Sequence, residues 1–219
     1  MKVINLGEKD SILNQFVSEL RDETIQKDRM RFRNNVRRIG HVMAYEISKQ
    51  LNYADNQIQT PLAPYTSRKV TDDIVLGTVF RAGLPLHEGF LDMFDKAGNA
   101  FLSAYRYYTD KECSNIDVHI EYLATPDLTD KLLLVVDPML ATGESLILAH
   151  KAFLTKGIPT KVIFASVIAT KEGIARMKKH FPGDDVVLYT AAIDPVLNEH
   201  KYIVPGLGDA GDLMYGEKL

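Results

Sequence analysis

The stretch that most constrains the fold is residues 131–136, KLLLVV, because it is unbroken in apolar character and is followed at once by Asp137 and ATGES. A strand that is apolar at almost every position must be buried on both faces, which is typical of the centre of a parallel sheet. The pattern then changes to ESLILAHKAFLTKG (144–157), a helical spacing closed by Gly157. The sequence therefore predicts a buried strand, a tight turn and a helix.

The same alternation of strand and helix continues along the chain. Strand patterns occupy residues 73–80, 99–108, 114–124, 160–170 and 185–193, and helix patterns occupy residues 84–94 and 171–181. Residues 114–124 alternate between polar and apolar, which favours an antiparallel or edge strand. Strands that alternate with helices imply an α/β domain, doubly wound around a mostly parallel sheet.

Both ends of the chain differ from this middle part. Residues 1–52 carry helical patterns and precede any strong strand signal, so we expect a helical lead-in packed on the main body. Residues 194–219 are rich in Gly and Pro but keep apolar residues, which predicts a structured loop or hairpin. Without a linker or repeat, residues 1–219 are interpreted as a single domain.

Composition excludes several classes of protein. The net charge of -3 gives no global field for nucleic acid, and the basic run at residues 29–38 spreads over more than one helical face, which favours a solvated or subunit-contacting surface. Cys113 has no second cysteine to pair with, which fits a reducing compartment. We find no signal-peptide pattern and no apolar run of about 18 residues, so we expect a cytoplasmic protein with no membrane partner.

Residues 137–145 predict an anion site, because backbone N–H groups in the turn and the N-terminus of the next helix can point at one ligand. Gly143 permits close approach, Thr142 and Ser145 can donate from hydroxyls, and Asp137 suits a vicinal diol. The alternative is a plain helix capped by Thr142 or Ser145. The stretch matches neither G-x-x-x-x-G-K-[ST] nor G-x-G-x-x-G, which argues against NTPase and dinucleotide sites.

Several motifs together resemble one family. VVDPMLATGES (135–145) is similar to the diphosphoribosyl-binding loop of the type I phosphoribosyltransferases, in the Asp-Pro form of the uracil phosphoribosyltransferases. FRAGLPLHEG (80–89) resembles their segment that meets the diphosphate, and AYR (104–106) resembles the segment with a second diphosphate-binding arginine. YIVPGLGDAGD (202–212) resembles their uracil-binding loop, and RDETIQKDRMRFRNN (21–35) their early helical segment.

The resemblance implies a reaction of uracil with 5-phospho-α-D-ribose 1-diphosphate (PRPP) to give UMP and diphosphate in pyrimidine salvage. It implies Mg²⁺ carried by the diphosphate rather than by a protein metal site. It implies a PRPP site of Arg81, Arg106, Asp137, Pro138, Met139, Leu140, Ala141, Thr142, Gly143, Glu144, Ser145 and Asp209. The implied uracil site, under a hood formed by residues 194–219, is Ile203, Gly208, Asp209 and Ala210.

Within these sites, the residues expected to take part in catalysis are Arg81, Arg106, Asp137 and Asp209. Family members assemble as dimers or larger and some respond to GTP, so the resemblance also implies a homo-oligomer and a GTP effector.

The sequence departs from the family pattern at Glu144, where a small residue is usual, and at Pro85 and His87. A first-turn Glu is favoured by the helix dipole, so we expect the Glu144 carboxylate to point outward. Residues 107–117 are interpreted as a flap over the substrate. Two other functions stay open on the same fold: an RNA-binding regulator of pyrimidine genes, and a non-catalytic nucleotide-binding paralogue.

Overall fold

The fold is built on one twisted sheet, described by a computed structural model that covers residues 1–108 and 116–217, with the side chains of 104–119 left undescribed. Among these residues the sheet has eight strands in the order β1-β10-β9-β7-β4-β5-β6, with β8 beside β9. The strands are β1 Lys2–Asn5, β4 Ile74–Val79, β5 Gly98–Tyr108, β6 Ile116–Ala124, β7 Leu132–Val136, β8 Met139–Leu140, β9 Lys161–Thr170 and β10 Val186–Asp194. All neighbours are parallel except β5 and β6, as predicted for residues 114–124.

Strand β7 lies between β4 and β9, and every one of its residues is buried. Leu132, Leu134 and Val136 face one hydrophobic core, whereas Leu133 and Val135 face the other. This two-sided burial explains why the strand is apolar at every position. The prediction of a central strand in a doubly wound sheet is confirmed.

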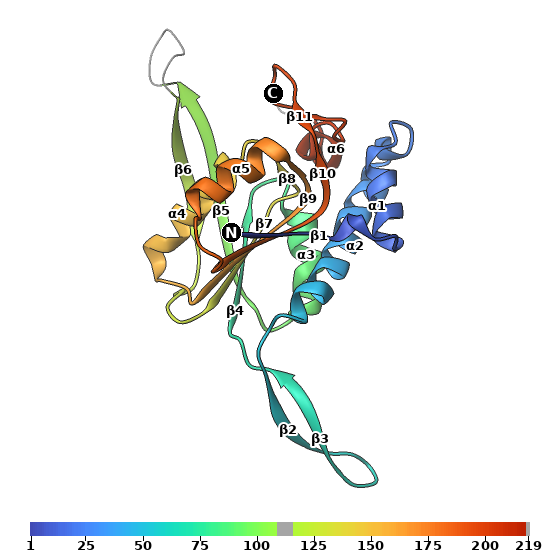
Figure 1. Cartoon of the computed structure of the whole chain (residues 1–219), viewed down its shortest axis with the longest axis vertical. Helices are drawn as coiled ribbons and strands as arrows, with labels where there is room; N and C mark the ends of the chain where they lie inside the picture. Colours follow the sequence, from blue (N-terminus) through green and yellow to red (C-terminus); the bar gives the residue numbers. More distant parts are fainter. Residues whose placement is uncertain (109–115, 218–219) are drawn as a thin grey trace.

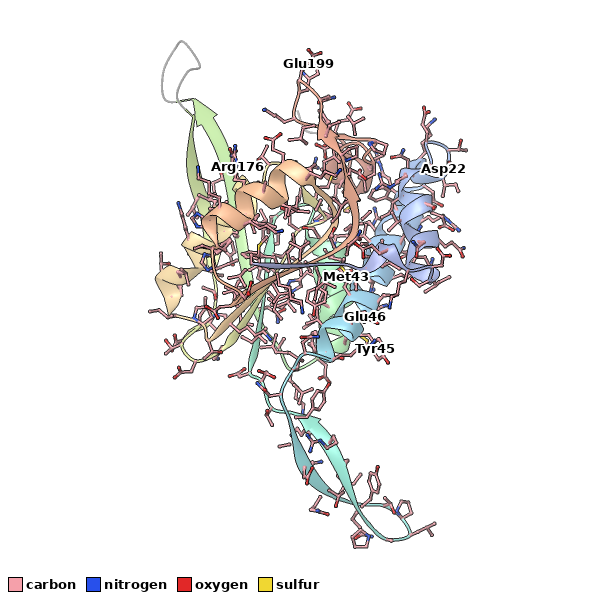
Figure 2. All side chains as sticks on the ribbon, viewed as in Figure 1. Asp22, Met43, Tyr45, Glu46, Arg176 and Glu199 are labelled. Atoms are coloured by element: carbon pink, nitrogen blue, oxygen red, sulfur yellow. The ribbon has the colours of Figure 1, made fainter. Side chains whose placement is uncertain are left out.

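Helices cover both faces of the sheet (Figure 1). One face carries α1 Ile12–Arg21, α2 Arg29–Ser48 and α3 Leu84–Met93, and the other carries α4 Glu144–Phe153 and α5 Lys171–His180. Helix α2 itself has a buried face and an exposed face: the Met43 side chain is fully buried against the core, whereas Tyr45 is 56% exposed (Figure 2). Among the described residues, no helix is both long enough and apolar enough to cross a membrane.

The start of the chain corrects one prediction. Residues 1–52 do contain α1 and α2, each begun by a side-chain cap, from Ser11 and from Asp28. They also contain β1, which pairs in parallel with β10 at the edge of the sheet and was not expected. A strand of four residues, KVIN, is too short to show a period, and its pairing depends on β10. Short 3-10 turns at Leu6–Glu8 and Ile25–Lys27 connect these elements.

A second element missed by the sequence is the arm, the antiparallel hairpin of β2 Tyr53–Gln59 and β3 Pro64–Val70. It projects from the body opposite the C-terminal segment (Figure 1). Its strands show no buried face, so the alternation that normally predicts a strand is absent.

The basic run of residues 29–38 is used inside the chain more than expected. Arg31 pairs with Glu19 on α1, and Arg37 pairs with Asp92 on α3. Arg33 donates to the carbonyl oxygen of Met214 at 2.6 Å. The run thus ties α2 to three other helices, while Arg31 and Arg37 stay 49% and 44% exposed, as expected for a solvated face.

The C-terminal segment, residues 194–219, forms the predicted hairpin, from β11 Val196–Leu197 and β12 Ile203–Val204. It continues into the short helix α6 Ala210–Tyr215, which the sequence analysis did not expect. The helix predicted at 144–157 is shorter than expected, because α4 gives way to a 3-10 turn at Leu154–Lys156 before Gly157.

Helices α2 and α3 cross in close contact at two glycines. A Cβ on Gly89 would lie 2.2 Å from the carbonyl oxygen of Arg37 and 3.0 Å from the Cα of Gly40. Residues 80–83 (FRAG) connect β4 to the start of α3. The contact between α2 and α3 therefore also fixes the position of this connecting segment.

We predict that Gly89→Ala lowers the free energy of unfolding by about 1–3 kcal/mol, as for overpacked cores. The steric cost outweighs the gain of about 1 kcal/mol in helix propensity. Urea denaturation measures the change, and Gly183→Ala is the control, because its Cβ would meet its nearest neighbour at 3.4 Å. A Gly89→Ala variant as stable as the control variant would contradict the close crossing.

Candidate functional site

A cavity of about 190 Å³ lies where β7 ends, at the carboxyl edge of the sheet. It is lined by Asp137, Met139, Leu140, Ala141, Thr142, Gly143, Ser145, Leu146 and Lys201. The loop predicted from sequence therefore does surround a cavity. Within the predicted loop 137–145, Pro138 and Glu144 are not in its wall; Arg81, Arg106 and Asp209 of the predicted PRPP set are not lining residues either, and Lys201 is a lining residue that the sequence analysis missed.

The first turn of α4 opens toward this cavity without a side-chain cap. Gly143 is the N-cap residue, in the left-handed region at φ 80°, and makes no side-chain cap bond. The closest substitute, from the Glu144 N–H to Thr142 Oγ1, is 3.5 Å long. The alternative of a helix capped by Thr142 or Ser145 is thus not what forms, and the helix N-terminus keeps its capacity for an anion.

Helix α5 supports the loop from behind. Thr170, which caps α5, donates from Oγ1 to the carbonyl oxygen of Ala141 at 2.6 Å. The backbone of Gly173 comes so close that a Cβ there would lie 2.3 Å from the same oxygen. Pro138 has a related role, because its carbonyl oxygen accepts hydrogen bonds from Val167 and Ile168 on β9. These contacts fix the loop to the rigid sheet.

Asp137 is the ionisable group of the loop that faces the cavity. Burial raises the pKa of its carboxyl to about 6, and the N–H of Met139, at 3.3 Å, only partly opposes the shift. A carboxylate that is costly to ionise in the empty site gains from hydroxyl donors or a cation supplied by a ligand.

Glu144 lies away from the cavity. Its side chain is 45% exposed and hydrogen-bonds to Arg176 on α5 (Figure 2). The outward orientation expected from sequence is therefore observed, and a guanidinium offsets its charge. This carboxylate does not oppose an anion in the cavity.

Arg81 lies at the other predicted part of the site, just after β4. Its Nη2 donates to Asp212 on α6 at 2.5 Å, and its Nε is buried without a partner among the described residues. A Cβ on Gly211 would meet the same guanidinium at 3.6 Å, so Arg81 packs along the start of α6. The structure thus joins the predicted diphosphate segment to the predicted base loop.

The second predicted arginine, Arg106, lies in β5 opposite Val118 of β6, and its side chain is outside the described residues. Most of the predicted flap, residues 107–117, consists of residues 109–115, which are also outside the part of the chain that the structure describes. Pro85 and His87 are buried within α3. His87 hydrogen-bonds to Asn99 at 2.7 Å, and burial lowers its pKa.

The predicted base loop, residues 202–212, contains Ile203 and Ala210, both of which are buried. Gly206 and Gly208 have φ values of 60° and 87°, which glycine adopts without strain. Asp209 caps α6, accepting a hydrogen bond from the Asp212 N–H at 3.0 Å. Asp209 therefore has a local structural role, because one of its carboxylate oxygens bonds the backbone of its own helix.

A network that the sequence analysis missed holds this loop. Arg21, the last residue of α1, donates to both carboxylate oxygens of Asp194 at 2.8 and 2.6 Å. Arg21 also donates to the carbonyl oxygen of Gly206, while the N–H of Gly206 donates to Asp194, each at 2.9 Å. The Asp194 side chain is only 5% exposed. Arg21 of the lead-in and Asp194 of β10 thus hold the loop at the carbonyl oxygen and the N–H of Gly206.

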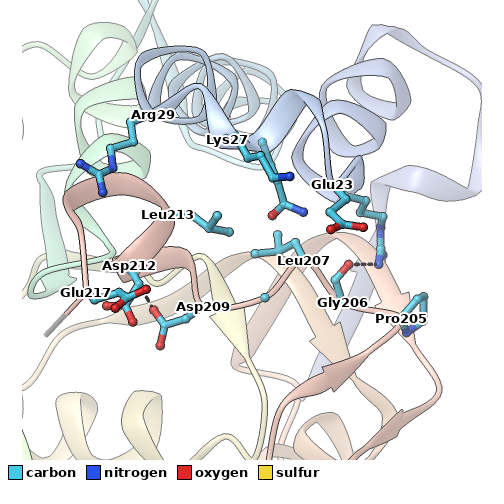
Figure 3. A pocket seen from close by; sticks show the side chains of 13 residues that line it. Glu23, Lys27, Arg29, Pro205, Gly206, Leu207, Asp209, Asp212, Leu213 and Glu217 are labelled. Atoms are coloured by element: carbon cyan, nitrogen blue, oxygen red, sulfur yellow. Dashed lines mark hydrogen bonds between the residues drawn. The ribbon is translucent and has the colours of Figure 1, made fainter.

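A second cavity, of about 600 Å³, separates the base loop from the turn between α1 and α2 (Figure 3). Leu207 and Leu213 contribute apolar side chains, and Lys27 and Arg29 contribute cations from the lead-in. Its remaining lining residues are Arg21, Glu23, Gln26, Pro205, Gly206, Gly208, Asp209, Asp212 and Glu217. The lead-in therefore forms part of the functional end of the molecule.

Comparisons with known proteins agree with this arrangement. A family model described as uracil phosphoribosyltransferase matches residues 8–217. A protein of Porphyromonas gingivalis named uracil phosphoribosyltransferase is 54% identical over 219 residues, covering all of both chains. A protein of the same name from Thermococcus gammatolerans is 35% identical over 97% of this chain and 92% of its own.

Solved structures give the same result for the fold. The AQ2163 protein from Aquifex aeolicus has a TM-score of 0.85 at 28% identity, covering 99% of each chain. Orotate phosphoribosyltransferase from Mycobacterium tuberculosis, solved with PRPP, has a TM-score of 0.50 at 13% identity over 87% of this chain and 95% of that one, a likeness of fold alone. The match over residues 8–217 decides the family. The chain belongs to the uracil phosphoribosyltransferase family.

Proposed function

We propose that the protein transfers the ribose 5-phosphate group of PRPP to N1 of uracil, giving UMP and diphosphate in pyrimidine salvage. The observation that carries this proposal is the connection of two segments. The smaller cavity is lined by the loop 137–145 and also by Lys201 of the β11–β12 hairpin, and Arg81 pairs with Asp212 of α6. A nucleotide needs both a phosphate cradle and a base loop within reach of one another. The family match supports the choice of uracil.

The first role we assign is to the arginines. As the bond from C1 of the ribose to diphosphate breaks and the bond to uracil N1 forms, negative charge grows on the leaving group. Fixed guanidinium groups lower the barrier to that step. Arg81, with an Nε that lacks a partner among the described residues, is suited to bind the diphosphate, and we assign Arg106 the same role by family resemblance.

The phosphate and ribose would bind along residues 137–145. Backbone amides at the start of α4, with the hydroxyls of Thr142 and Ser145, would hold the 5-phosphate. The desolvated carboxylate of Asp137 would accept hydrogen bonds from the ribose hydroxyls, which relieves its burial cost.

Uracil would be read by the main chain of the base loop. Its edge presents an acceptor, a donor and an acceptor, and main-chain groups of Ile203, Gly208 and Ala210 can match that order. Cytosine carries an amino group in place of O4, so an N–H donor there would reject it. Asp209 uses Oδ1 as a helix cap, and we propose that its remaining carboxylate oxygen orients uracil N1 or its proton.

Mg²⁺ fits this chemistry as an ion bound to the diphosphate. No cluster of three or more acidic, His or Cys side chains in the described part of the chain is arranged to hold a metal. Mg²⁺ accepts one or two carboxylates beside substrate phosphates, and the Asp137 carboxylate is an oxygen ligand of that kind. When bound, the ion would offset the negative charge of the diphosphate.

We also propose a homodimer or larger assembly. The arm exposes Ile58, Leu62 and Tyr65, with Leu62 at 96%, and an isolated two-stranded hairpin is marginally stable. Contact with a second copy would cover these side chains. A GTP effector and a cytoplasmic location are further proposals. Gel filtration measures the size of the assembly, and a change of size when GTP is added would support the GTP effector.

The assay that tests the main proposal supplies the purified protein with PRPP, Mg²⁺ and one base at a time: uracil, cytosine, hypoxanthine or orotate. We expect turnover with uracil and none with the other bases, because only uracil matches the proposed order of main-chain groups. Release of diphosphate measures it. Failure to turn over any base would reject the enzyme and leave a binding protein.

We predict that Asp137→Asn lowers kcat/KM about 100-fold, as for loss of a polar transition-state contact, yet stabilises the empty protein at pH 8. Because the pKa of about 6 in the folded protein exceeds the ordinary aspartate pKa of 3.8, ionisation opposes folding. The destabilisation caused by ionised Asp137 is absent below about pH 4, grows between about pH 4 and pH 6, and is complete above about pH 6. At about 1.4 kcal/mol per pKa unit, the gain at pH 8 is about 3 kcal/mol at most.

Thermal unfolding at pH 4 and pH 8 checks this, with Asp95→Asn as control, because Asp95 is exposed. An equal effect of Asp137→Asn at both pH values would rule out the burial explanation.

We predict that Arg21→Lys raises the KM for uracil roughly tenfold, the equivalent of about 1.4 kcal/mol, because lysine cannot bind Asp194 and Gly206 together. The KM for PRPP should change little. Arg31→Lys is the matched control, since Arg31 makes a similar two-bond contact with Glu19 away from the loop. Equal changes of both KM values in both variants would show a general structural effect instead.

A further inference from the structure

The smaller cavity has a cation in its wall that none of the roles above requires. Of its lining residues only Asp137 and Lys201 carry charge. Lys201 is exposed, like most lysines, and its side chain makes no hydrogen bond or ion pair with any other described residue, so its ammonium group is free to reach a ligand in the cavity. A lysine without a partner, placed at a cavity under an uncapped helix N-terminus, points to an anionic ligand.

The backbone that carries Lys201 is held by its own turn. The Asn198 side chain accepts hydrogen bonds from the N–H groups of His200 and Tyr202, at 3.0 and 2.9 Å. The N–H of Lys201 donates to the carbonyl oxygen of Asn198 at 3.0 Å. In this turn Lys201 has φ 64°, a region that favours glycine and that a lysine occupies at a cost. The fold thus keeps a long cationic side chain at a position where glycine would be easier.

We propose that Lys201 binds the 5-phosphate of the ribosyl substrate, reaching it from the C-terminal hairpin. This rests on the proposed function of the cavity. The loop offers hydroxyls and amides to the phosphate but no cation of its own, and the nearby Arg176 already bonds Glu144. A flexible ammonium group suits a phosphate as a point charge.

The same residue would connect the two halves of the site. Lys201 lies two residues before the start of β12, and β12 is the first part of the base loop. A phosphate bound to Lys201 would hold the hairpin against residues 137–145, and so would hold the base loop near the ribose. Lys201 is thereby a binding residue for the phosphate and a positioning residue for the base loop.

The test uses Lys201→Gln, Lys201→Arg and Lys201→Gly in the full chain, with ribose 5-phosphate as the probe in calorimetry and PRPP with uracil in steady-state assays. We expect Lys201→Gln to weaken ribose 5-phosphate binding and raise the KM for PRPP about tenfold, with weaker dependence on salt. Lys201→Arg should retain binding. Lys201→Gly should bind as poorly as Lys201→Gln but unfold at higher temperature than wild type, because glycine removes the backbone cost.

Lys27→Gln is the control, because Lys27 is an exposed lysine beside the larger cavity. Unchanged affinity for ribose 5-phosphate in Lys201→Gln and Lys201→Gly, with normal turnover by wild type, would overturn the role of Lys201 and leave the proposed function intact. If the wild type binds ribose 5-phosphate but turns over no base, the proposed function fails. In that case the affinities of the variants still decide the role of Lys201.

Discussion

The burial of β7 on both faces is the constraint on which the other features depend. Alternate residues of this strand enter two separate cores, so helices must cover both sides of the sheet and the strands beside β7 must also be apolar. Backbone groups then remain open mainly where strands end. At that edge the chain turns through Asp137 and Gly143 into α4, and the smaller cavity lies at this turn.

The phosphate loop and the base loop are stabilised in different ways. The phosphate loop is fixed by the sheet and by α5, through Pro138 and Thr170. The base loop has little regular structure of its own and depends on residues far away in sequence, Arg21 and Asp194. This dependence explains why an N-terminal helical region belongs to the catalytic domain. These contacts hold the loop in place before any ligand binds, which under the proposed function reduces the entropy lost when a base binds.

Periodic signals could be predicted from sequence, and contacts that depend on tertiary pairing could not. The central sheet, α2 and α3 follow from hydrophobic spacing alone, and the loop at 137–145 follows from a strand end beside a turn. Strand β1 and the arm could not be predicted from sequence, because neither has a buried face with a repeating hydrophobic pattern. Arg21 and Lys201 could not be predicted for another reason: Arg21 bonds residues far away in sequence, and Lys201 lines a cavity formed mainly by residues 137–146. The roles of Arg81 and of the base loop came from family resemblance, since a lone arginine or a Gly-rich turn is not specific.

The close approach of Gly173 to Ala141 has a consequence for protein engineering. Replacing helical glycines by alanine is a common route to higher melting temperatures, worth about 1 kcal/mol at each suitable position. Gly173, in the first turn of α5, satisfies the usual criteria for such a replacement. A methyl group there would collide with the carbonyl oxygen of Ala141 and displace the loop in front of it. Any thermostabilisation programme or consensus redesign should therefore leave this glycine unchanged, because the damage would fall on ligand affinity before it appeared as unfolding.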